Sequence, residues 1–247
     1  TLLSAGHCKD CGSCSNQCEI TLLRDGVRVP GACTPPAGTE YRGVLRFKVA
    51  DQPAPEVHEY TAVLPSGAAV DFLGVVLESR DVQPYLLPPT SSRLRYVAYG
   101  DSITQGWCGR GSPYPEAIAE VNGFEAINMG MQGLTAAFGA TAGHGTAIGE
   151  QRPDLVTVMI GANDVLKGDS AETITKNVGT ILDQLRAEAP HVTTVVITPT
   201  LVPDNRIGHF RAALRKEVHG RIQQDPRLFL LEGAPLLPSS WQFLDGM

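Results

Sequence analysis

A serine stands where a nucleophile could be presented, directly after the apolar run at residues 94–99. It is Ser102, in the pentapeptide GDSIT at residues 100–104. A hydroxyl at the turn that ends a buried strand is held forward, and the backbone N–H groups of such a turn can bind an anion. A structural role is the alternative, because Asp and Ser commonly cap the helix that follows a strand.

Three further segments combine glycine with polar side chains. They are NMGMQGLT at residues 128–135, GAND at residues 161–164 and LDGM at residues 244–247. Glycine N–H groups and asparagine amides are hydrogen-bond donors of the kind that ester hydrolysis needs. Its tetrahedral intermediate carries negative charge on the carbonyl oxygen, and preorganised N–H groups must meet that charge. A turn glycine and a loop-capping asparagine are the structural alternatives for Gly133 and Asn163.

The elements that must position these segments alternate along the second part of the chain. Candidate strands lie at residues 94–99, 124–128, 155–160, 192–198 and 228–231. Candidate helices lie at residues 114–121, 134–149, 171–189 and 205–223. Alternation of this kind predicts a parallel sheet covered by helices on both sides. Active sites of such sheets lie at the carboxyl ends of the strands, where the polar segments fall.

The first part of the chain has a different pattern. Residues 1–33 are rich in Cys, Gly and Ser, which predicts a loop region with little regular structure. Between residues 43 and 78, short β-rich runs broken by turn residues predict the antiparallel strands of a small β-sandwich. These runs lie near residues 44–49, 60–64 and 70–77. The proline-rich stretch at 84–89 is a stiff connector, so we predict an N-terminal domain at 1–88 and an α/β domain at 94–247.

Taken in order, the four polar segments resemble the four conserved blocks of the SGNH (GDSL-type) hydrolases. The resemblance covers roughly residues 94–247 and implies a three-layer, flavodoxin-like α/β fold with a parallel sheet. It implies that Ser102 is the nucleophile of a serine esterase. It also implies an oxyanion hole made by the backbone N–H groups of Ser102 and Gly133 and the side-chain amide of Asn163. Gly130 is the neighbour to test should Gly133 prove wrong.

The general base of the family falls outside this sequence. The last block of the family is Asp-x-x-His, in which the aspartate orients the histidine. Asp245 fits the aspartate, and the position expected for the histidine is the one that follows Met247. We favour a sequence cut before the base, with a non-catalytic pseudoenzyme that kept the fold as the alternative. The histidines that are present lack the family's spacing to Asp245, so we expect them to be surface or core residues.

A β-sandwich before an SGNH domain is similar to the arrangement in carbohydrate esterase family two, which removes acetyl groups from polysaccharides. This resemblance implies a short acyl ester, on carbohydrate, as the substrate. Some esterases of that kind use a Ser–His dyad, whereas Asp245 indicates a full triad. Trp107 could stack on a sugar ring or simply pack. A lipase or thioesterase of the same superfamily is the alternative. We expect no cofactor and no metal for the reaction.

Six cysteines bear on whether the protein is secreted, and five of them lie within the first 33 residues. They are Cys8, Cys11, Cys14, Cys18, Cys33 and Cys108. An even number suits three disulfides and a secreted protein. The spacing of the first four is also that of a bacterial iron–sulfur cluster, and with His7 they could bind zinc. The pairing of the cysteines cannot be deduced from the sequence.

The charge and hydropathy of the chain exclude other classes of partner. The net charge is −6, and the basic residues are scattered apart from a short cluster at residues 206–221, which we interpret as a solvated helix face; this argues against a nucleic-acid partner. No run approaches the ~18 apolar residues of a membrane span. The sequence starts at Thr1 without a signal peptide, so we expect a processed form or a fragment. The oligomeric state is not indicated.

Overall fold

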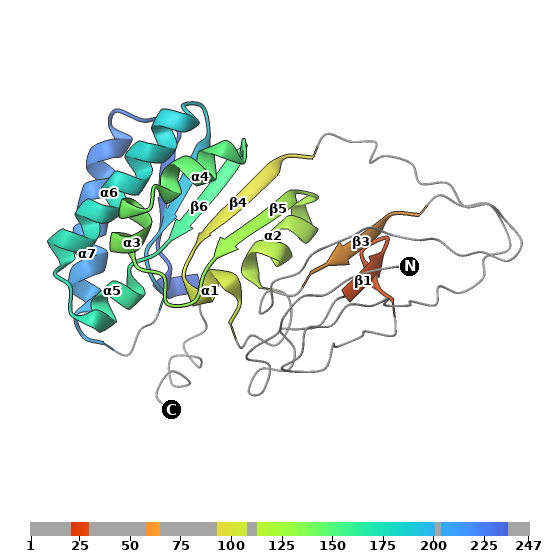
Figure 1. The fold of residues 1–247 in the computed structure, drawn as a ribbon, viewed down its shortest axis with the longest axis horizontal. Coiled ribbons are helices and arrows are strands. Elements are labelled where there is room, and N and C mark those ends of the chain that lie inside the picture. Colours follow the sequence, from red (N-terminus) through yellow and green to blue (C-terminus); the bar gives the residue numbers. More distant parts are fainter. Residues whose placement is uncertain (1–20, 30–57, 65–92, 108–112, 201–203, 237–247) are drawn as a thin grey trace, which may run out of the picture. The chain divides into compact units, whose positions relative to one another are not determined.

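The computed structural model describes residues 21–29, 58–64, 93–107, 113–200 and 204–236. The contacts divide the chain into two units (Figure 1). One comprises Thr1–Ser92 with Gly106–Ser112, and the other comprises Arg93–Gln105 with Pro113–Met247. The domain limits expected from the sequence, 1–88 and 94–247, stay predictions.

A five-stranded parallel sheet forms the centre of the second unit. Its strands are β4 (Arg95–Gly100), β5 (Glu125–Gly130), β6 (Leu155–Met159), β7 (Thr193–Ile197) and β8 (Leu228–Leu231). Their order is β5-β4-β6-β7-β8, so the second strand of the unit lies at one edge and the first lies beside it. This is the strand order of flavodoxin-like folds. The five strands expected from the sequence are confirmed, with ends that differ by at most two residues.

Helices cover both faces of this sheet (Figure 1). Val97 and Tyr99 of β4 point into a core shared with five helices, whereas Tyr96 and Ala98 point to the other face. The five helices are α3 (Ala136–Thr141), α4 (His144–Glu150), α5 (Ala162–Lys167), α6 (Ala171–Glu188) and α7 (Ile207–Ile222). Helix α2 (Tyr114–Asn122) covers the other face through Ala119. Because β4 is buried on both faces, its sequence is an apolar run rather than an alternating pattern.

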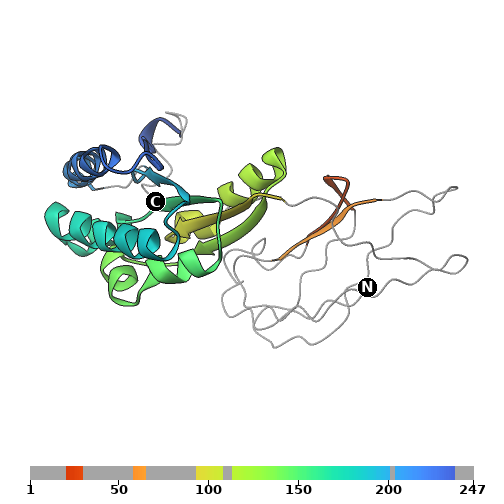
Figure 2. The same cartoon turned by 90° about the horizontal axis from the view of Figure 1, so that it is seen from above.

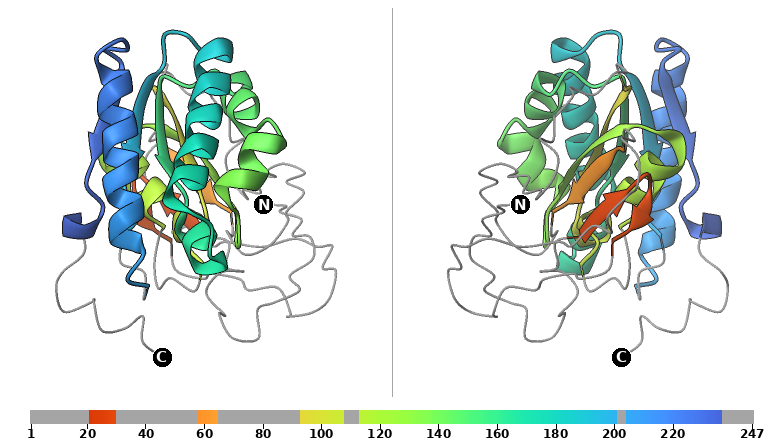
Figure 3. Two further views of the ribbon diagram at one scale, coloured as in Figure 1. Left: turned by 90° about the vertical axis from the view of Figure 1, so that its left-hand side faces the viewer. Right: turned by 90° about the vertical axis from the view of Figure 1, so that its right-hand side faces the viewer.

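The two long helices lie side by side on one face of the sheet (Figures 2 and 3). Helix α6 buries the apolar stripe that its sequence predicts, with Ile174, Val178 and Ile181 each at most 1% exposed. The helix begins after Ser170, whose hydroxyl accepts a hydrogen bond from the Thr173 N–H at 3.2 Å. Such a cap satisfies one of the N–H groups that a helix leaves unpaired at its start.

The prediction of a single helix at residues 134–149 is wrong in one respect, because the structure has two helices there. Helix α3 ends at Thr141 and α4 begins at His144. Gly143 between them has φ +74°, a left-handed conformation that interrupts the helical backbone and that glycine adopts at little cost. The connection turns the chain so that both short helices pack against α6.

The described part of the first unit is a three-stranded antiparallel sheet in the order β2-β1-β3. Strand β3 (Tyr60–Val63) confirms the run expected there, whereas β1 (Thr21–Arg24) and β2 (Val27–Arg28) fall in the segment expected to be irregular. That expectation is wrong for the hairpin. Asp25 and Gly26 have φ +51° and +76°, as in the two-residue type I′ turn that Asp-Gly favours.

The other features expected of the first unit lie outside the described residues. They are the runs near 44–49 and 70–77 and all six cysteines. The β-sandwich, the disulfides and the alternative metal sites therefore stay predictions. No helix within the described ranges combines the length and the apolar character that crossing a membrane requires.

Two glycines allow a matched test of the packing of α4 on α6. A Cβ on the buried Gly145 would collide with the Ile181 carbonyl oxygen, which is backbone and cannot turn aside, whereas one on Gly220 of α7 would meet nothing within 4 Å. We expect Gly145→Ala to lower the free energy of unfolding by about 1–3 kcal/mol. Gly220→Ala should raise it by up to about 1 kcal/mol, because alanine favours a helix. Urea unfolding of both variants measures this, and equal stabilities would contradict the packing.

Candidate active site

Three strands of the sheet end at the same level, and the polar segments follow those ends. Gly100 at the end of β4 pairs with Gly130 of β5 and with Met159 of β6. The Met131 N–H donates to the Gly100 carbonyl oxygen at 3.0 Å, so the chain leaving β5 starts beside the chain leaving β4. The segments with Ser102, Gly133 and Asn163 therefore all leave the sheet at its carboxyl edge.

Ser102 is the first residue of a short helix, α1 (Ser102–Gln105), directly after β4. Asp101 is 2% exposed and supports this turn twice. Its Oδ1 accepts from the Ile103 N–H at 3.0 Å, and its carbonyl oxygen accepts from the Gln105 N–H at 3.0 Å. Ser102 itself is half-buried. Asp101 thus shapes the turn that presents the serine.

The two glycines after β5 differ in a way that bears on the oxyanion hole. Gly130 lies so close to α1 that a Cβ there would overlap the backbone of Thr104 and Gln105. The N–H of Gly130 already donates to Asn128 Oδ1 at 2.9 Å. Gly133 is exposed, has φ +72° and has nothing within 4 Å of an added Cβ. Of the two, Gly133 has the open surroundings that an approaching substrate requires.

Asn163 connects the third strand end to the segment that contains Gly133. It lies in α5 (Ala162–Lys167), a short helix that the sequence analysis missed. Gly161, at φ +112°, turns the chain from β6 into this helix. The Asn163 Nδ2 donates to the Leu134 carbonyl oxygen at 2.9 Å. The side chain of Asn163 therefore lies against the residue that follows Gly133.

Two acidic side chains are buried beneath the site. Asp164 is fully buried, and burial raises its pKa, while hydrogen bonds from the N–H groups of Ala136 and Ala137 lower it. Burial also raises the pKa of Asp101 to about 6, with a further increase from the charge of Asp164 and an opposing effect of the Ile103 N–H. Neither carboxyl group is exposed enough to act on a substrate directly.

Asn128 is a supporting residue whose contacts the sequence analysis missed. Its Nδ2 donates to the Thr104 carbonyl oxygen at 2.9 Å and to Glu116 Oε1 of α2 at 3.0 Å. The Thr104 hydroxyl in turn lies 3.1 Å from the Tyr114 hydroxyl. These bonds tie α1 to β5 and to α2. In the sequence, Asn128 is visible only as a polar side chain near the end of β5, a strand that also begins with the polar Glu125.

The remaining site predictions fare differently. Asp245 lies outside the described residues, so its role stays a prediction. Trp107 belongs by its contacts to the first unit, and its stacking on sugar stays a prediction. His144 packs edge-on against Tyr99, with its Nδ1 3.1 Å from the Tyr99 hydroxyl, as expected of a core histidine. Three other histidines of the second unit are exposed. They are His191, His209 and His219.

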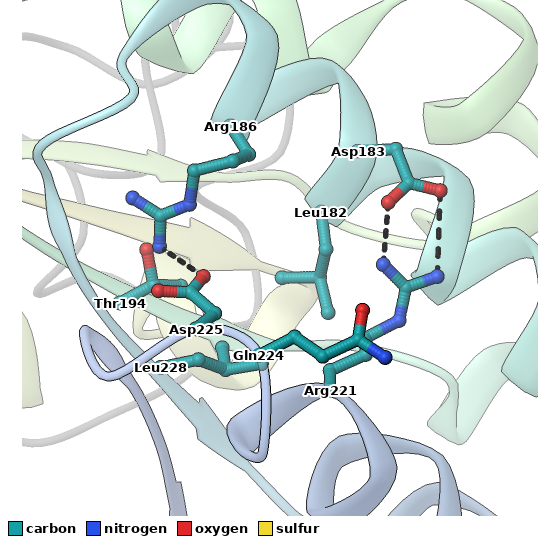
Figure 4. A pocket seen from close by; sticks show the side chains of 8 residues that line it. All are labelled: Leu182, Asp183, Arg186, Thr194, Arg221, Gln224, Asp225 and Leu228. Carbon is teal, nitrogen blue, oxygen red and sulfur yellow. Dashed lines mark hydrogen bonds and ion pairs between the residues drawn. The ribbon is translucent and has the colours of Figure 1, made fainter.

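A cavity of about 190 Å³ lies at the amino ends of the strands, the opposite ends from those that carry the candidate site (Figure 4). Thr194 and Leu228, at the amino ends of β7 and β8, line it together with residues of α6 and residues at and beyond the end of α7. Both arginines that line it are paired with acids, Arg186 with Asp225 at 2.7 Å and Arg221 with Asp183. No residue that the sequence marks as catalytic lines this cavity. Among the described residues, no group of three His, Cys, Asp or Glu side chains is placed to hold a metal ion.

Residues 98–227 match the model of the GDSL-like lipase/acylhydrolase family. The match covers more than half of the chain, so the chain belongs to this family, which confirms the resemblance seen in the sequence blocks. Membership supports a hydrolase that acts on esters. A search of curated proteins found no match.

Solved structures that resemble the chain share its fold at low sequence identity. An active-site mutant of a family two carbohydrate esterase from Clostridium thermocellum is 14% identical, with a TM-score of 0.67 over 87% of this chain and 75% of that one. A putative GDSL-like lipase from Bacteroides ovatus is 17% identical, with a TM-score of 0.66 over 96% and 71%. The salicylyl-acyltransferase SsfX3 is 15% identical, with a TM-score of 0.56 over 93% and 65%.

The buried carboxyl group of Asp101 should make stability depend on pH. A folded-state pKa of about 6, above the ordinary 3.8, means that folding favours the protonated acid. This contribution is complete below about pH 4 and is lost as the pH rises through 6, at a cost of about 3 kcal/mol. We expect Asp101→Asn, which cannot ionise, to remove that loss. Urea unfolding at pH 4 and pH 7.5 measures the difference.

The exposed Glu150 at the end of α4 provides the control for this experiment. Glu150→Gln removes one carboxylate from the surface and should leave the difference between the two pH values as it is in the wild type. If Asp101→Asn also leaves that difference unchanged, the assignment of the pH dependence to Asp101 is wrong.

Proposed function

We propose that the protein is a secreted serine esterase that hydrolyses short acyl esters, acetyl esters on carbohydrate in particular. One observation supports this most strongly. Three strands end in register, and the segments that contain Ser102, Gly133 and Asn163 leave the sheet together at its carboxyl edge. Membership of the GDSL-like family supports the ester class of substrate. The carbohydrate part rests on the likeness to a family two carbohydrate esterase, which was solved in complex with cellohexaose.

In this proposal the hydroxyl oxygen of Ser102 attacks the ester carbonyl carbon. The histidine expected after Met247 takes the serine proton and passes it to the leaving alcohol, and Asp245 orients that histidine. The carbonyl π electrons move onto oxygen in the tetrahedral intermediate and return when the bond to the alcohol breaks. A water molecule, deprotonated by the same histidine, then attacks the carbonyl carbon of the acyl-enzyme. The bond to the Ser102 oxygen breaks, this oxygen takes the proton from the histidine, and the acid is released from the restored enzyme.

The oxyanion would accept hydrogen bonds from the backbone N–H groups of Ser102 and Gly133 and from the amide of Asn163. Two features support this set. The space beside Gly133 is open. The hydrogen bond to the Leu134 carbonyl oxygen uses one of the two amide hydrogens of Asn163 and fixes the orientation of the other. Donors that are already fixed need no reorganisation when the charge develops, and loss of one typically costs about 10²–10³ in rate.

We expect a fluorophosphonate probe to label Ser102, because an activated serine reacts with phosphorus as it does with an ester carbonyl. The experiment uses the full-length gene product, the variant Ser102→Ala and the control Ser170→Ala, which changes an exposed serine that caps α6. Labelling should persist in the control and disappear in Ser102→Ala. An unlabelled wild type would support a pseudoenzyme, and equal labelling of Ser102→Ala would exclude Ser102 as the nucleophile.

A chain-length series separates the proposed short-acyl esterase from a lipase or thioesterase of the same superfamily. We expect kcat/KM on p-nitrophenyl esters to be highest for acetate and to fall as the acyl chain is lengthened, because a short-acyl site gains nothing from additional methylene groups. A rise with chain length would favour the lipase. An acetylated oligosaccharide that is hydrolysed no faster than ethyl acetate, whose leaving alcohol is of comparable acidity, would count against carbohydrate as the substrate.

A further inference from the structure

The segment that contains Gly133 is held by the turn that contains Asn163, through contacts on both sides of Thr135. On one side, Asn163 donates to the Leu134 carbonyl oxygen at 2.9 Å. On the other side, Asp164 accepts from the Ala136 N–H at 2.9 Å through Oδ2 and from the Ala137 N–H at 3.3 Å through Oδ1. Two consecutive side chains of one turn therefore hold a segment 27 to 29 residues away in the sequence.

We propose that Asp164 is a positioning residue for the oxyanion hole, which fixes the Gly133 N–H relative to the Asn163 amide. The inference rests on the proposed function, since it takes these two groups as donors to one oxygen. Asp164 does not touch the substrate. It acts through the backbone N–H groups of Ala136 and Ala137, which lie three and four residues after Gly133.

Asp164 completes the cap of α3 from a distant part of the chain. The first N–H groups of a helix need acceptors, and the Thr135 hydroxyl supplies one of them by accepting from the Phe138 N–H at 3.2 Å. Asp164 accepts from the Ala136 and Ala137 N–H groups with its two carboxyl oxygens. Because this acceptor lies in the turn that follows β6, it links two strand-end segments as well as capping one helix.

The burial of Asp164 carries a desolvation cost that an apolar residue filling the same space would not have. Asp164 is fully buried, and it forms no ion pair with any residue that the structure describes. Burying a carboxyl group is unfavourable unless hydrogen bonds compensate, and two backbone N–H groups do so here. An asparagine of the same size has one acceptor oxygen, so its NH₂ group would face one of the two N–H donors. Asp164→Asn should therefore shift the segment with little change in volume.

The test measures kcat and KM of the full-length gene product on p-nitrophenyl acetate. We expect Asp164→Asn to lower kcat about 10- to 100-fold, because small displacements of catalytic groups are costly, and to change KM less than about threefold. Asp154→Asn is the control. Asp154 Oδ2 accepts from the Arg95 N–H at 2.8 Å, at the amino end of β4, so this variant makes the same exchange of carboxylate for amide where only one acceptor oxygen is needed, and it should keep kcat.

A double-mutant cycle distinguishes positioning from general support. If Asp164 acts through the oxyanion hole, the loss of kcat in Asn163→Ala combined with Asp164→Asn should be smaller than the product of the two single losses, since both changes damage donors to the same oxygen. Losses that multiply would overturn the proposal, as would a kcat for Asp164→Asn equal to that of Asp154→Asn. If Asp164→Asn does not fold, the smaller pair Asp164→Ser and Asp154→Ser carries the same expectations.

The outcomes also separate this inference from the proposed function. A wild type without turnover that depends on Ser102 would overturn the esterase and the positioning role together. Turnover that depends on Ser102 but is indifferent to Asp164 would overturn only the positioning role.

Discussion

The register of three parallel strands is the constraint on which the site depends. Hydrogen bonds between β4, β5 and β6 hold Gly100, Gly130 and Met159 at one level. Parallel strands send their carboxyl ends to the same edge, so residues from distant parts of the chain can meet there without any contact specific to catalysis. The arrangement of the polar residues at the carboxyl ends of these strands depends on the strands ending at the same level. A shift of one residue in the register of β5 would turn its side chains to the other face.

Around the carboxyl ends of these strands, several features that hold the segments in place are locally unfavourable for folding. Two carboxyl groups, Asp101 and Asp164, are almost completely buried, although water solvates charge better than the protein does. Gly100 and Gly130 allow approaches that any side chain would block. Costs of this kind concentrate where a site must be rigid, because donors that have to move when charge develops lose much of their effect. The rest of the unit, with its continuous apolar core, supplies the stability that offsets them.

The sequence was most informative where burial is simple. The central strands β4 and β6 are buried along most of their length, so their apolar runs marked their ends to within one residue, whereas the edge strands β5 and β8 are more exposed. Helix α6 was equally clear, because its buried stripe repeats over many turns. Helices α1 and α5, with four and six residues, are too short to show a period. The hairpin turn at Asp25 and Gly26 has a dipeptide signal in the sequence, but it lies in the cysteine-rich segment that the sequence analysis expected to be irregular.

The sequence suggested members of the site but none of the contacts that support them, and the catalytic roles stay predictions. Sequence blocks marked Ser102, Gly133 and Asn163, whereas the bonds of Asn128 and Asp164 depend on which strands are neighbours and in what register, information that no local pattern contains. Gly130 and Gly133 looked alike in the sequence, and only their surroundings in space distinguish them. Asp245 lies outside the described residues, so the third member of the expected triad has no geometry.

The tight packing of α1 on the end of β5 has a consequence for how substrate preference could change. Since backbone meets backbone there, neither partner leaves room for variation. Exposed apolar side chains near the proposed catalytic residues in the sequence are free of that restriction. Ile103, Met131 and Leu166 are each 40% to 52% exposed and lie within three residues of Ser102, Gly133 or Asn163. Because they are exposed, substitutions at these three positions need not disturb the packing of α1 on β5, which makes them a starting library for altering selectivity.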